Sequence, residues 1–488
     1  MVVLALIFFT WISALKADGL PDEIASLKEE LRQLQQVALR LQARVERLES
    51  AREASPAAAF VAQSENPRAP ASVEGNKLGP IRFDGEFRLY FDSLTRHEGG
   101  GAPRVQNIRG RYLLHLDFSA RLNSKLTFNG RLSTAPITNE LTDIQDFAGG
   151  VTKHPFFLSH AYIDYRPNPY LTLQGGRLDS PFNDKSRFLF DIDTRFNGTT
   201  EIVRIPFKDA PFGFKSIQFL AGQYIFTNPN LPIIPAGTAS TAATATPQQA
   251  LLAAGTTPGT QPRVSALFQQ GFIADQSIGS ISQQAQFDMQ IYRNPNQLRL
   301  LSTAAGAFLV GGGIGITPSG PQPTVGNATT TPTGAVLNAS AFRVAHVSYT
   351  IAHGAVPLLN RNVPISLNLQ VARNTATHSA RDAFAAILTA GRSKEHGDVR
   401  VIGAFYRKQA NSLISELTEN DIAINSNVNM NAYVGRFEYT FTRAVSLAND
   451  LIWTNWIRSS DPAANFFVPL GNAVPTQFRY QATLIFKF

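Results

Sequence analysis

The chain has 488 residues, of which 44% are hydrophobic, 16% are charged and none is cysteine, so disulfide scaffolds, cysteine zinc sites, thiolate-held iron–sulfur clusters and cysteine nucleophiles are excluded. The net charge is +8, and residues 80–488 carry 35 Lys and Arg against 26 Asp and Glu, spread thinly along the chain. Because no block of basic residues is present, we expect no nucleic-acid partner.

Residues 1–17 have the features of a secretory signal peptide. They read MVVLALIFFTWISALKA, an apolar run of about 14 residues followed by Lys16-Ala17. A transmembrane helix needs about 20 apolar residues, so this run is too short to span and has the length of a signal-peptide core. A basic segment before the run is missing and Leu15 stands where a small residue is preferred, which leaves a buried N-terminal helix as the alternative.

A heptad repeat follows in residues 18–52 and predicts a periplasmic α-helical coiled coil. Four consecutive heptads with leucine at every d position are typical of coiled coils. The a and d positions that form the predicted core are Ile24, Leu27, Leu31, Leu34, Ala38, Leu41, Val45 and Leu48. The coil predicts a homo-oligomer, with a trimer favoured over a dimer, and a single amphipathic helix packed on its own domain is the alternative. Residues 53–79 are rich in Ala, Pro, Ser, Glu and Asn, and we expect a flexible linker there.

Residues 80–488 are dominated by an alternation of apolar and polar residues. Between residues 81 and 95 the odd positions are mostly apolar or glycine and the even positions mostly charged, and residues 108–122 and 126–133 alternate in the same way. Strict alternation gives a strand one apolar and one polar face. These segments are longer than most strands of soluble proteins, and Asn123-Ser124 is predicted to be the tight turn between two of them.

The connections between these segments fall into two length classes. Residues 442–444 form a short one, whereas residues 228–262 and 311–338 are long tracts rich in Pro, Ala, Thr and Gly. A membrane barrel with short periplasmic turns and long outer loops accommodates both. At roughly 25 residues for each strand and its connection, residues 80–488 give about 16 strands, in a range of about 14–18. We therefore expect an all-β fold, a transmembrane antiparallel β-barrel with an aqueous channel, preceded by the coiled coil.

The polar face of the first three strands is unusually charged. Burying so many charges in a dry core would cost several kcal/mol each, whereas a water-filled lumen removes that cost. Two interpretations stay open: the side chains set the field and the size limit of a pore, or they only pair with one another and stiffen the wall. The predicted pore-lining residues are Arg82, Asp84, Glu86, Arg88, Arg109, Arg111, Asp117, Arg121 and Arg131.

Motifs of enzymes and metal sites are absent from the sequence. The eight histidines contain no HExxH motif and no helical i,i+4 pair, and the chain has neither a GxSxG elbow nor a phosphate-binding loop. We predict no catalytic residue, no metal and no cofactor. A barrel hydrolase whose Ser, His and Asp come from neighbouring strands stays as an alternative, because such partners are distant in sequence.

The chain ends on an alternating aromatic strand. Tyr480, Leu484 and Phe486 precede the terminal Phe488, with polar residues between them. A terminal phenylalanine in this setting resembles the signal that the outer-membrane barrel assembly machinery reads, so we predict Phe488 as the assembly signal and that machinery as a partner.

Residues 108–207 and the segment that starts at Asp382 contain several short sequence motifs. These motifs are Gly175-Gly176-Arg177-Leu178, Ser180-Pro181-Phe182, Gly391-Arg392-Ser393-Lys394 and Gly397-Asp398. In these segments the chain resembles the putative porin family of bacterial outer membranes, whose members often carry an N-terminal coiled coil. The resemblance implies a barrel in the lipid of the outer membrane that passes small solutes, and it assigns no substrate.

The function expected from the sequence is an outer-membrane porin for passive diffusion of small hydrophilic solutes and ions, with a mild preference for anions. The first alternative is a structural anchor whose periplasmic coiled coil tethers the envelope, with peptidoglycan as its partner. A barrel hydrolase and a soluble all-β adhesin are the other two.

Overall fold

A computed structural model describes residues 81–97, 105–135, 142–147, 153–207, 211–226, 264–295, 328–331, 334–337, 341–358, 361–419, 421–422, 428–457 and 476–488. The predicted signal peptide, coiled coil and linker lie outside these residues. Among the residues that are described, no helix is long and apolar enough to cross a membrane.

The described chain forms a closed antiparallel barrel of 16 strands. Consecutive strands pair around the ring, and β19 pairs with β1 to close it. The barrel strands are β1 (Ile81–His97), β2 (Val105–Arg121), β3 (Leu126–Thr134), β5 (Phe156–Asn168), β6 (Leu171–Leu178), β7 (Phe196–Pro206), β8 (Phe214–Ile225), β9 (Ala266–Ile278), β10 (Ile281–Arg293), β13 (Phe342–Leu358), β14 (Arg361–Asn374), β15 (Asp382–Gly391), β16 (Val399–Lys408), β17 (Met430–Thr442), β18 (Val445–Trp456) and β19 (Thr476–Lys487).

Five further elements of the described chain lie outside the ring of 16 strands. The two-residue strand β4 (Gln145–Asp146) pairs with β2. Strands β11 (Ala328–Thr331) and β12 (Gly334–Leu337) form a separate hairpin. Two single turns of 3-10 helix are η1 (Pro211–Gly213) and η3 (Ser415–Leu417). The prediction of an all-β antiparallel barrel of about 16 strands is confirmed.

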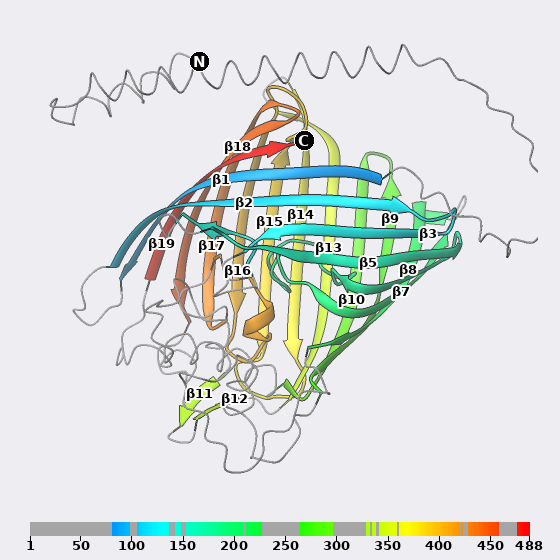
Figure 1. Ribbon diagram of the computed structural model, residues 1–488, viewed down its shortest axis with the longest axis horizontal. Helices are drawn as coiled ribbons and strands as arrows, with labels where there is room; N and C mark the ends of the chain where they lie inside the picture. Colours follow the sequence, from blue (N-terminus) through cyan, green and yellow to red (C-terminus); the bar gives the residue numbers. More distant parts are fainter. Residues whose placement is uncertain are drawn as a thin grey trace, which may run out of the picture. The chain divides into compact units, whose positions relative to one another are not determined.

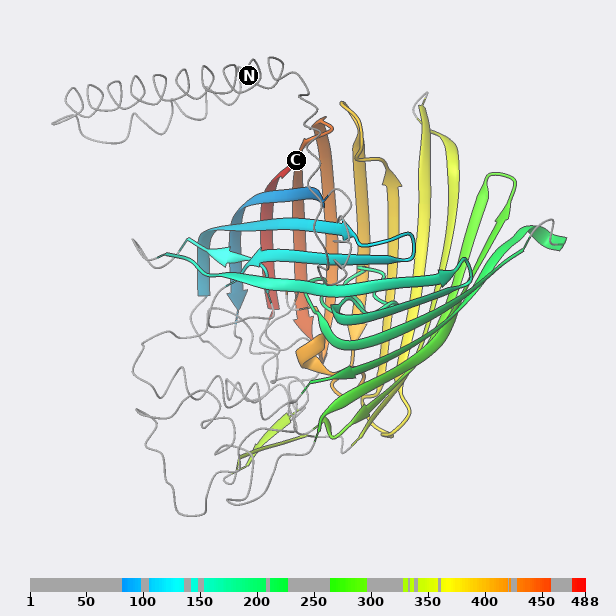
Figure 2. The ribbon, with the colours of Figure 1, turned by 45° about the vertical axis from the view of Figure 1, so that its right-hand side comes forward.

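The strands of opposite walls cross one another. In Figure 1, β1, β2, β3 and β5 run across the view while β13 to β17 run up and down it. Figure 2 shows the green strands between them, up to β10, curving round toward the yellow strands β13 and β14. Strongly tilted strands are what closing a sheet into a barrel requires.

Short and long connections alternate around the barrel, so that the short ones gather at one end. The turn between β2 and β3 is the predicted Asn123-Ser124, where the amide of Leu122 donates to the carbonyl of Leu126. Between β9 and β10 the tight turn places Gly279 at φ 58°, in the left-handed region that glycine tolerates best. The connections that follow β6 and β16, among other long ones, leave the barrel at the other end.

The alternation of the sequence becomes two faces of the wall. Along β1 the apolar set packs sideways on the neighbouring strands, as Phe87 does on Tyr112 of β2 and on Phe486 of β19. Phe83 and Phe91 of the same set are 73% and 49% exposed. Exposed apolar side chains in rows around a closed barrel are the surface that a lipid bilayer covers.

The C-terminal residue belongs to the seam that closes the barrel. The amide of Phe488 donates to the carbonyl of Gly85, and the amide of Gly85 donates back to the carbonyl of Phe488. The Phe488 ring also covers Gly85, because a Cβ at that glycine would lie 2.2 Å from the ring. Phe488 therefore extends the pairing of β19 with β1 by one residue.

Candidate functional site: the lumen and two inward segments

The segment that follows β6, residues 179–195, is called here the first inward segment. Its hydrogen bonds to the wall show which side of the strands faces the lumen. Ser180 donates to Gln269 of β9 at 2.7 Å, Gln370 of β14 donates to Asp184 at 2.7 Å, and Tyr406 of β16 donates to the carbonyl of Ser186 at 2.7 Å. A connection between β6 and β7 can reach β14 and β16 only by crossing the lumen. The polar side of these strands therefore faces inward.

A second inward segment follows β16 and comprises residues 409–419 with 421 and 422. It meets the first one directly, since the amide of Asp191 donates to the carbonyl of Leu417 at 2.8 Å and the hydroxyl of Thr418 donates to the carbonyl of Phe188 at 3.1 Å. Lys408, at the end of β16, joins both segments by donating to the carbonyl of Arg187 at 3.1 Å and to the Thr418 hydroxyl at 2.7 Å.

The two inward segments share one apolar core with the wall behind them. Its buried members are Phe188, Leu189, Phe190, Leu413, Ile414, Leu417 and Ile422 of the segments, together with inward residues of the wall that include Phe342, Val344, Ala385, Met430 and Ile452. Most of the wall members come from β13 to β18. This part of the lumen is therefore packed with side chains.

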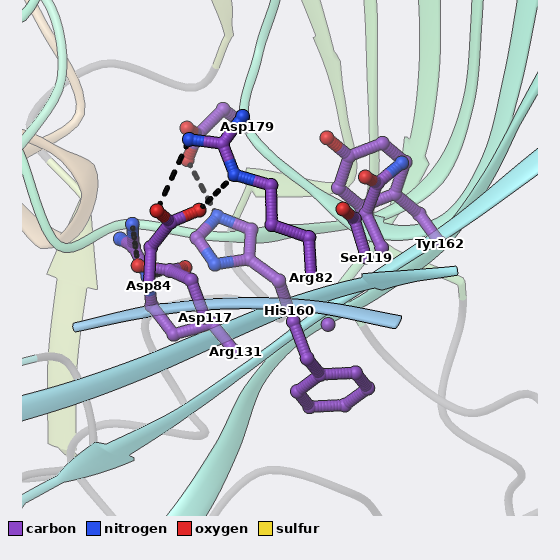
Figure 3. A pocket seen from close by; sticks show the side chains of 11 residues that line it. Arg82, Asp84, Asp117, Ser119, Arg131, His160, Tyr162 and Asp179 are labelled. Atoms are coloured by element: carbon purple, nitrogen blue, oxygen red, sulfur yellow. Dashed lines mark hydrogen bonds and ion pairs between the residues drawn. The ribbon is translucent and has the colours of Figure 1, made fainter. Parts of the chain in front are cut away.

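Two cavities of the described chain lie along the other wall. One of about 300 Å³ is lined by polar and charged side chains that Figure 3 shows converging from β1, β2, β3 and β5, namely Arg82, Asp84, Asp117, Ser119, Arg131, His160 and Tyr162, with Asp179 of the first inward segment. A second, of about 250 Å³, shares His160, Tyr162 and Asp179 and adds Gln174, Gln218, Leu220 and Ile273. An open path through the barrel would run along this wall.

The arginines predicted to line the pore lie beside carboxylates. Arg82 pairs with Asp84 at 2.8 Å, and Arg131 pairs with Asp117 at 2.7 Å from the neighbouring strand. Arg88 pairs with Glu86. Arg121 lies exposed at the end of β2, next to the turn. Pairing is what the alternative interpretation of stiffened walls predicts, and it weakens the net positive field that unpaired arginines would produce.

Arg109 and Arg111 belong to a larger group, called here the central ion cluster. Asp92 of β1 is fully buried and accepts from Arg109 at 2.9 Å and from Arg479 of β19 at 2.6 Å. Arg111 lies 3.2 Å from the same carboxylate. Asp421 of the second inward segment lies 3.3 Å from Arg479, and Asp146 of β4 lies 3.4 Å from Arg109. Three arginines and three carboxylates therefore meet here and balance in charge.

Carboxylates of the long connections pair with the wall next to the cavities. His160 and Arg195 lie 3.2 and 3.3 Å from the same oxygen of Asp179, and Arg195 lies 3.7 Å from Asp143, which is hydrogen bonded to His115 at 2.9 Å. Burial alone would raise the pKa of Asp179, but the His160 hydrogen bond and the Arg195 charge outweigh it and lower the pKa to about 2. Asp179 is therefore a fixed negative charge in the cavity.

Glu419 of the second inward segment differs from Asp179, because its pKa is raised and not lowered. It is fully buried, both of its carboxylate oxygens lack a hydrogen-bond partner within the described residues, and Arg187 lies 3.9 Å away. Burial raises the pKa of Glu419 to about 7, against the lowering effect of Arg187. Its charge therefore changes near neutral pH.

Some residues of the lumen were outside the sequence prediction. Arg479 lies two residues from Gln481 on the polar face of β19, and Asp92 continues the polar positions of β1, so the alternation itself points to both. The inward direction of the two inward segments has a weaker signal. The run Phe188-Leu189-Phe190 is more apolar than a solvated loop, but it does not tell where the loop packs.

The described residues contain no group of three or more His, Asp or Glu side chains arranged to hold a metal ion. The ion pairs and hydrogen bonds of the lumen instead form a fixed polar lining along one wall. Such a lining can orient and slow a passing solute, and its charges can bias which ions enter.

Comparison with known proteins gives one family match. Three solved structures resemble the chain over 84% of its length: OprB of Pseudomonas putida (12% identity, 94% of that chain, TM-score 0.45), an anion-selective porin from Comamonas acidovorans (10%, 99%, 0.43) and OmpF of Salmonella typhi in complex with daunomycin (12%, 97%, 0.43). No curated protein matches the chain. Residues 102–248 match the model of a family described as putative porin, in line with the resemblance noted in the sequence.

Proposed function

We propose that this protein is an outer-membrane porin through which small hydrophilic solutes and ions diffuse passively. The observation that carries the proposal is the pair of faces on one closed wall, apolar outside and polar inside, around a lumen that two inward segments narrow without removing the polar cavities beside β1, β2, β3 and β5. The family match over residues 102–248 supports it.

The narrowing of the lumen by the two inward segments limits the size of the solutes that are expected to pass. The apolar core under the two inward segments fills the side of β13 to β18, so the path runs between the first inward segment and the opposite wall. Solutes pass His160, Tyr162 and Asp179, which border both cavities. We expect the conductance of single channels to be small for a barrel of 16 strands.

The proposed ion preference is mild and favours anions. Residues 80–488 carry an excess of nine positive charges, which supports this sign. The pairing of Arg82, Arg131 and the central ion cluster with carboxylates keeps the preference weak. No chemical step is proposed, so the protein is not assigned as an enzyme.

Single-channel recording tests the proposal. The purified protein is inserted in a planar bilayer, and the reversal potential is measured across a tenfold KCl gradient. Discrete conductance steps with a small reversal potential of anion-selective sign are expected. Absence of steps from protein that is folded and inserted would contradict the porin function.

A structural anchor is the second candidate, favoured by the heptad repeat of residues 18–52. In this proposal the signal peptide of residues 1–17 directs secretion, the assembly machinery reads Phe488, and the coil contacts peptidoglycan from the periplasm. Sedimentation with purified peptidoglycan, compared between the full chain and a variant lacking residues 18–52, distinguishes the two. Binding that is lost with the coil, in a protein without channel activity, would support the anchor.

A further inference from the structure

The outward face of β7, β8 and β9 carries a group of polar side chains, called here the wall patch: Thr199, Glu201, Gln223 and Gln270. All four are exposed. Thr199 lies opposite Gln223 in the β7–β8 pairing. Glu201 lies opposite Ala221, which lies opposite Gln270 in the β8–β9 pairing. The four side chains are therefore contiguous across three strands.

The wall patch lies inside the apolar belt and not at its edge. Gln270 stands between Phe268 and Phe272 on β9, which are 41% and 38% exposed. On β8, Gln223 is followed toward the long connections by Ile225, which is 50% exposed. Toward the short turns, β7 continues outward with Val203 and Ile205. Apolar side chains thus bound the patch on both sides.

Several other outward polar side chains of the wall are paired within the wall. Tyr480 donates to Asn449 at 2.8 Å between β19 and β18, and Arg373 of β14 pairs with Asp382 of β15 at 2.6 Å. Among the described residues, no hydrogen bond or ion pair reaches the side chains of the wall patch. Lipid tails offer neither, and unsatisfied polar groups in hydrocarbon are costly. The patch therefore needs a polar partner from outside its own wall.

We propose that a second copy of this chain covers the wall patch in the membrane. The patch is chemically complementary to itself, because the Glu201 carboxylate accepts hydrogen bonds while the amides of Gln223 and Gln270 and the hydroxyl of Thr199 donate them. A contact in which Ala221 of each copy faces the symmetry axis brings Glu201 of one copy toward Gln270 of the next, in a dimer or in a trimer. Ala221 is small, which lets the two walls approach.

The predicted coiled coil of residues 18–52 is an independent reason to choose a second copy as the partner. A coil that joins chains holds identical barrels side by side, all inserted in the same orientation, so equal depths of two walls face each other. The inference rests on the proposed membrane location, but it does not depend on transport. Channel recordings and the experiment below can therefore fail separately.

Site-directed photo-crosslinking tests the contact. Because the chain has no cysteine, an introduced cysteine is the single labelling site. Ala221→Cys is labelled with a benzophenone maleimide and irradiated in outer membranes. The matched control is Leu388→Cys, which is on the outward face of β15 and 50% exposed. Both variants are first checked for the gel mobility of a folded barrel. We expect Ala221→Cys to give an adduct of twice the chain mass. The crosslinked peptide in this adduct should come from β7, β8 or β9 of the second copy. The control should give at least fivefold less of the adduct.

Adducts with lipid only, with a different protein, or in equal yield at both positions would overturn the proposal. A second variant pair separates the contact from folding. If the patch faces a second copy, Glu201→Leu with Gln270→Leu lowers the oligomer fraction in mild detergent at least threefold and leaves the monomer folded. If the patch faces lipid, the same substitutions leave the oligomer fraction unchanged and raise the melting temperature.

Discussion

Most of the arginines predicted to line the pore lie beside a carboxylate. Arg131 donates to both oxygens of Asp117 across the β2–β3 pairing, at 2.7 and 3.1 Å. Both side chains are partly exposed to the cavity, so the pair adds little to stability, as exposed ion pairs generally do. Its two charges nearly cancel in the lumen. Selectivity at this position therefore depends on the balance between two neighbours and not on one arginine.

Removing one member of this pair is expected to change ion preference with a sign that depends on which charge is lost. Arg131→Gln leaves Asp117 unpaired and shifts the reversal potential in the direction of cation selectivity. Asp117→Asn shifts it in the direction of anion selectivity. Both shifts are expected at ~0.1 M salt, where charges act over about 10 Å, and largely vanish near ~1 M, where the range is about 3 Å. Planar-bilayer recording measures them.

The double variant Arg131→Gln with Asp117→Asn serves as the control, and it is expected to restore a reversal potential close to that of the unmodified chain. Equal shifts from both single variants, or shifts that persist at high salt, would show that these side chains do not act through their charge on ions in the lumen.

A charge on the outward face is expected to impair folding instead. Phe87 packs on Phe486 with ring centroids 6.1 Å apart, in the apolar row that faces lipid. Phe87→Arg should cost about 2–4 kcal/mol of unfolding free energy if the site is near the bilayer midplane. Equilibrium unfolding from lipid vesicles measures it. Unchanged stability would mean that the faces of β1 are assigned the wrong way round.

At the scale of elements, two connections that leave the barrel at the long-loop end turn back into it and pack on each other. Their docking combines an apolar core with buried charged groups whose partners are incomplete. Glu419 is the clearest example, because its oxygens accept no hydrogen bond within the described residues. A buried carboxyl of this kind favours its neutral form.

Docking of the second inward segment should therefore weaken as pH rises. The pKa of Glu419 is raised from 4.5 to about 7 in the docked segment. A raised carboxyl pKa means that the docked state binds the proton more tightly, so docking is strongest below about pH 4.5 and is weakened progressively up to about pH 7. We expect faster hydrogen–deuterium exchange of residues 409–419 at pH 8 than at pH 5, after correction for intrinsic rates.

Glu419→Gln is the matched variant, since the amide is neutral at both pH values. Residues 409–419 of this variant should show slow hydrogen–deuterium exchange at pH 8 as well as at pH 5. If the variant keeps the full pH dependence, another group in the segment is responsible, and the role given to Glu419 is wrong.

The coiled coil is an element that the sequence predicts and the described residues do not include. Replacing Leu27, Leu34 and Leu41 by Asp places charges in successive d layers and should abolish association through the coil. Sedimentation equilibrium of the full chain in detergent measures the change in oligomer size. A peptide of residues 20–52 that stays monomeric at high concentration would contradict the coil itself.

At the scale of the whole molecule, closure is what makes the barrel resistant to unfolding. Each of the 16 strands of the ring is paired on both sides, and Phe488 completes the pairing of β19 with β1. A closed barrel has no free edge at which unfolding or association can begin. The rows of exposed apolar residues need a bilayer or detergent around them.

Deletion of Phe488 should sharply lower the yield of assembled barrel, because it removes two backbone hydrogen bonds of the seam and the predicted assembly signal. The readout is the fraction of chain in outer membranes that migrates faster on gels without boiling than after boiling. Phe488→Tyr keeps the aromatic ring and the backbone pairing and should assemble normally. Normal yield from the deletion would show that the terminal residue is dispensable.

The sequence by itself determined the strands, their two faces and the size of the barrel. Alternation with a period of two gives each strand one polar and one apolar face, so the even positions from Arg82 to Asp92 could be assigned to the inner face from local pattern alone. The same pattern includes Arg479, which the tertiary structure then brings to Asp92 from the other end of the chain.

Only the tertiary structure decided where the long connections go and what the charges meet. Alternation places a side chain on a face, but it does not say which of the 16 strands or connections lies opposite, because those partners are set by closure and by loop packing over large sequence distances. Asp421 reaches Arg479, and Phe188 packs with Leu413, through contacts that have no local signal. The predicted rows of arginines thus became paired charges beside a lumen that is partly filled, because two connections bury their apolar side chains inside the barrel.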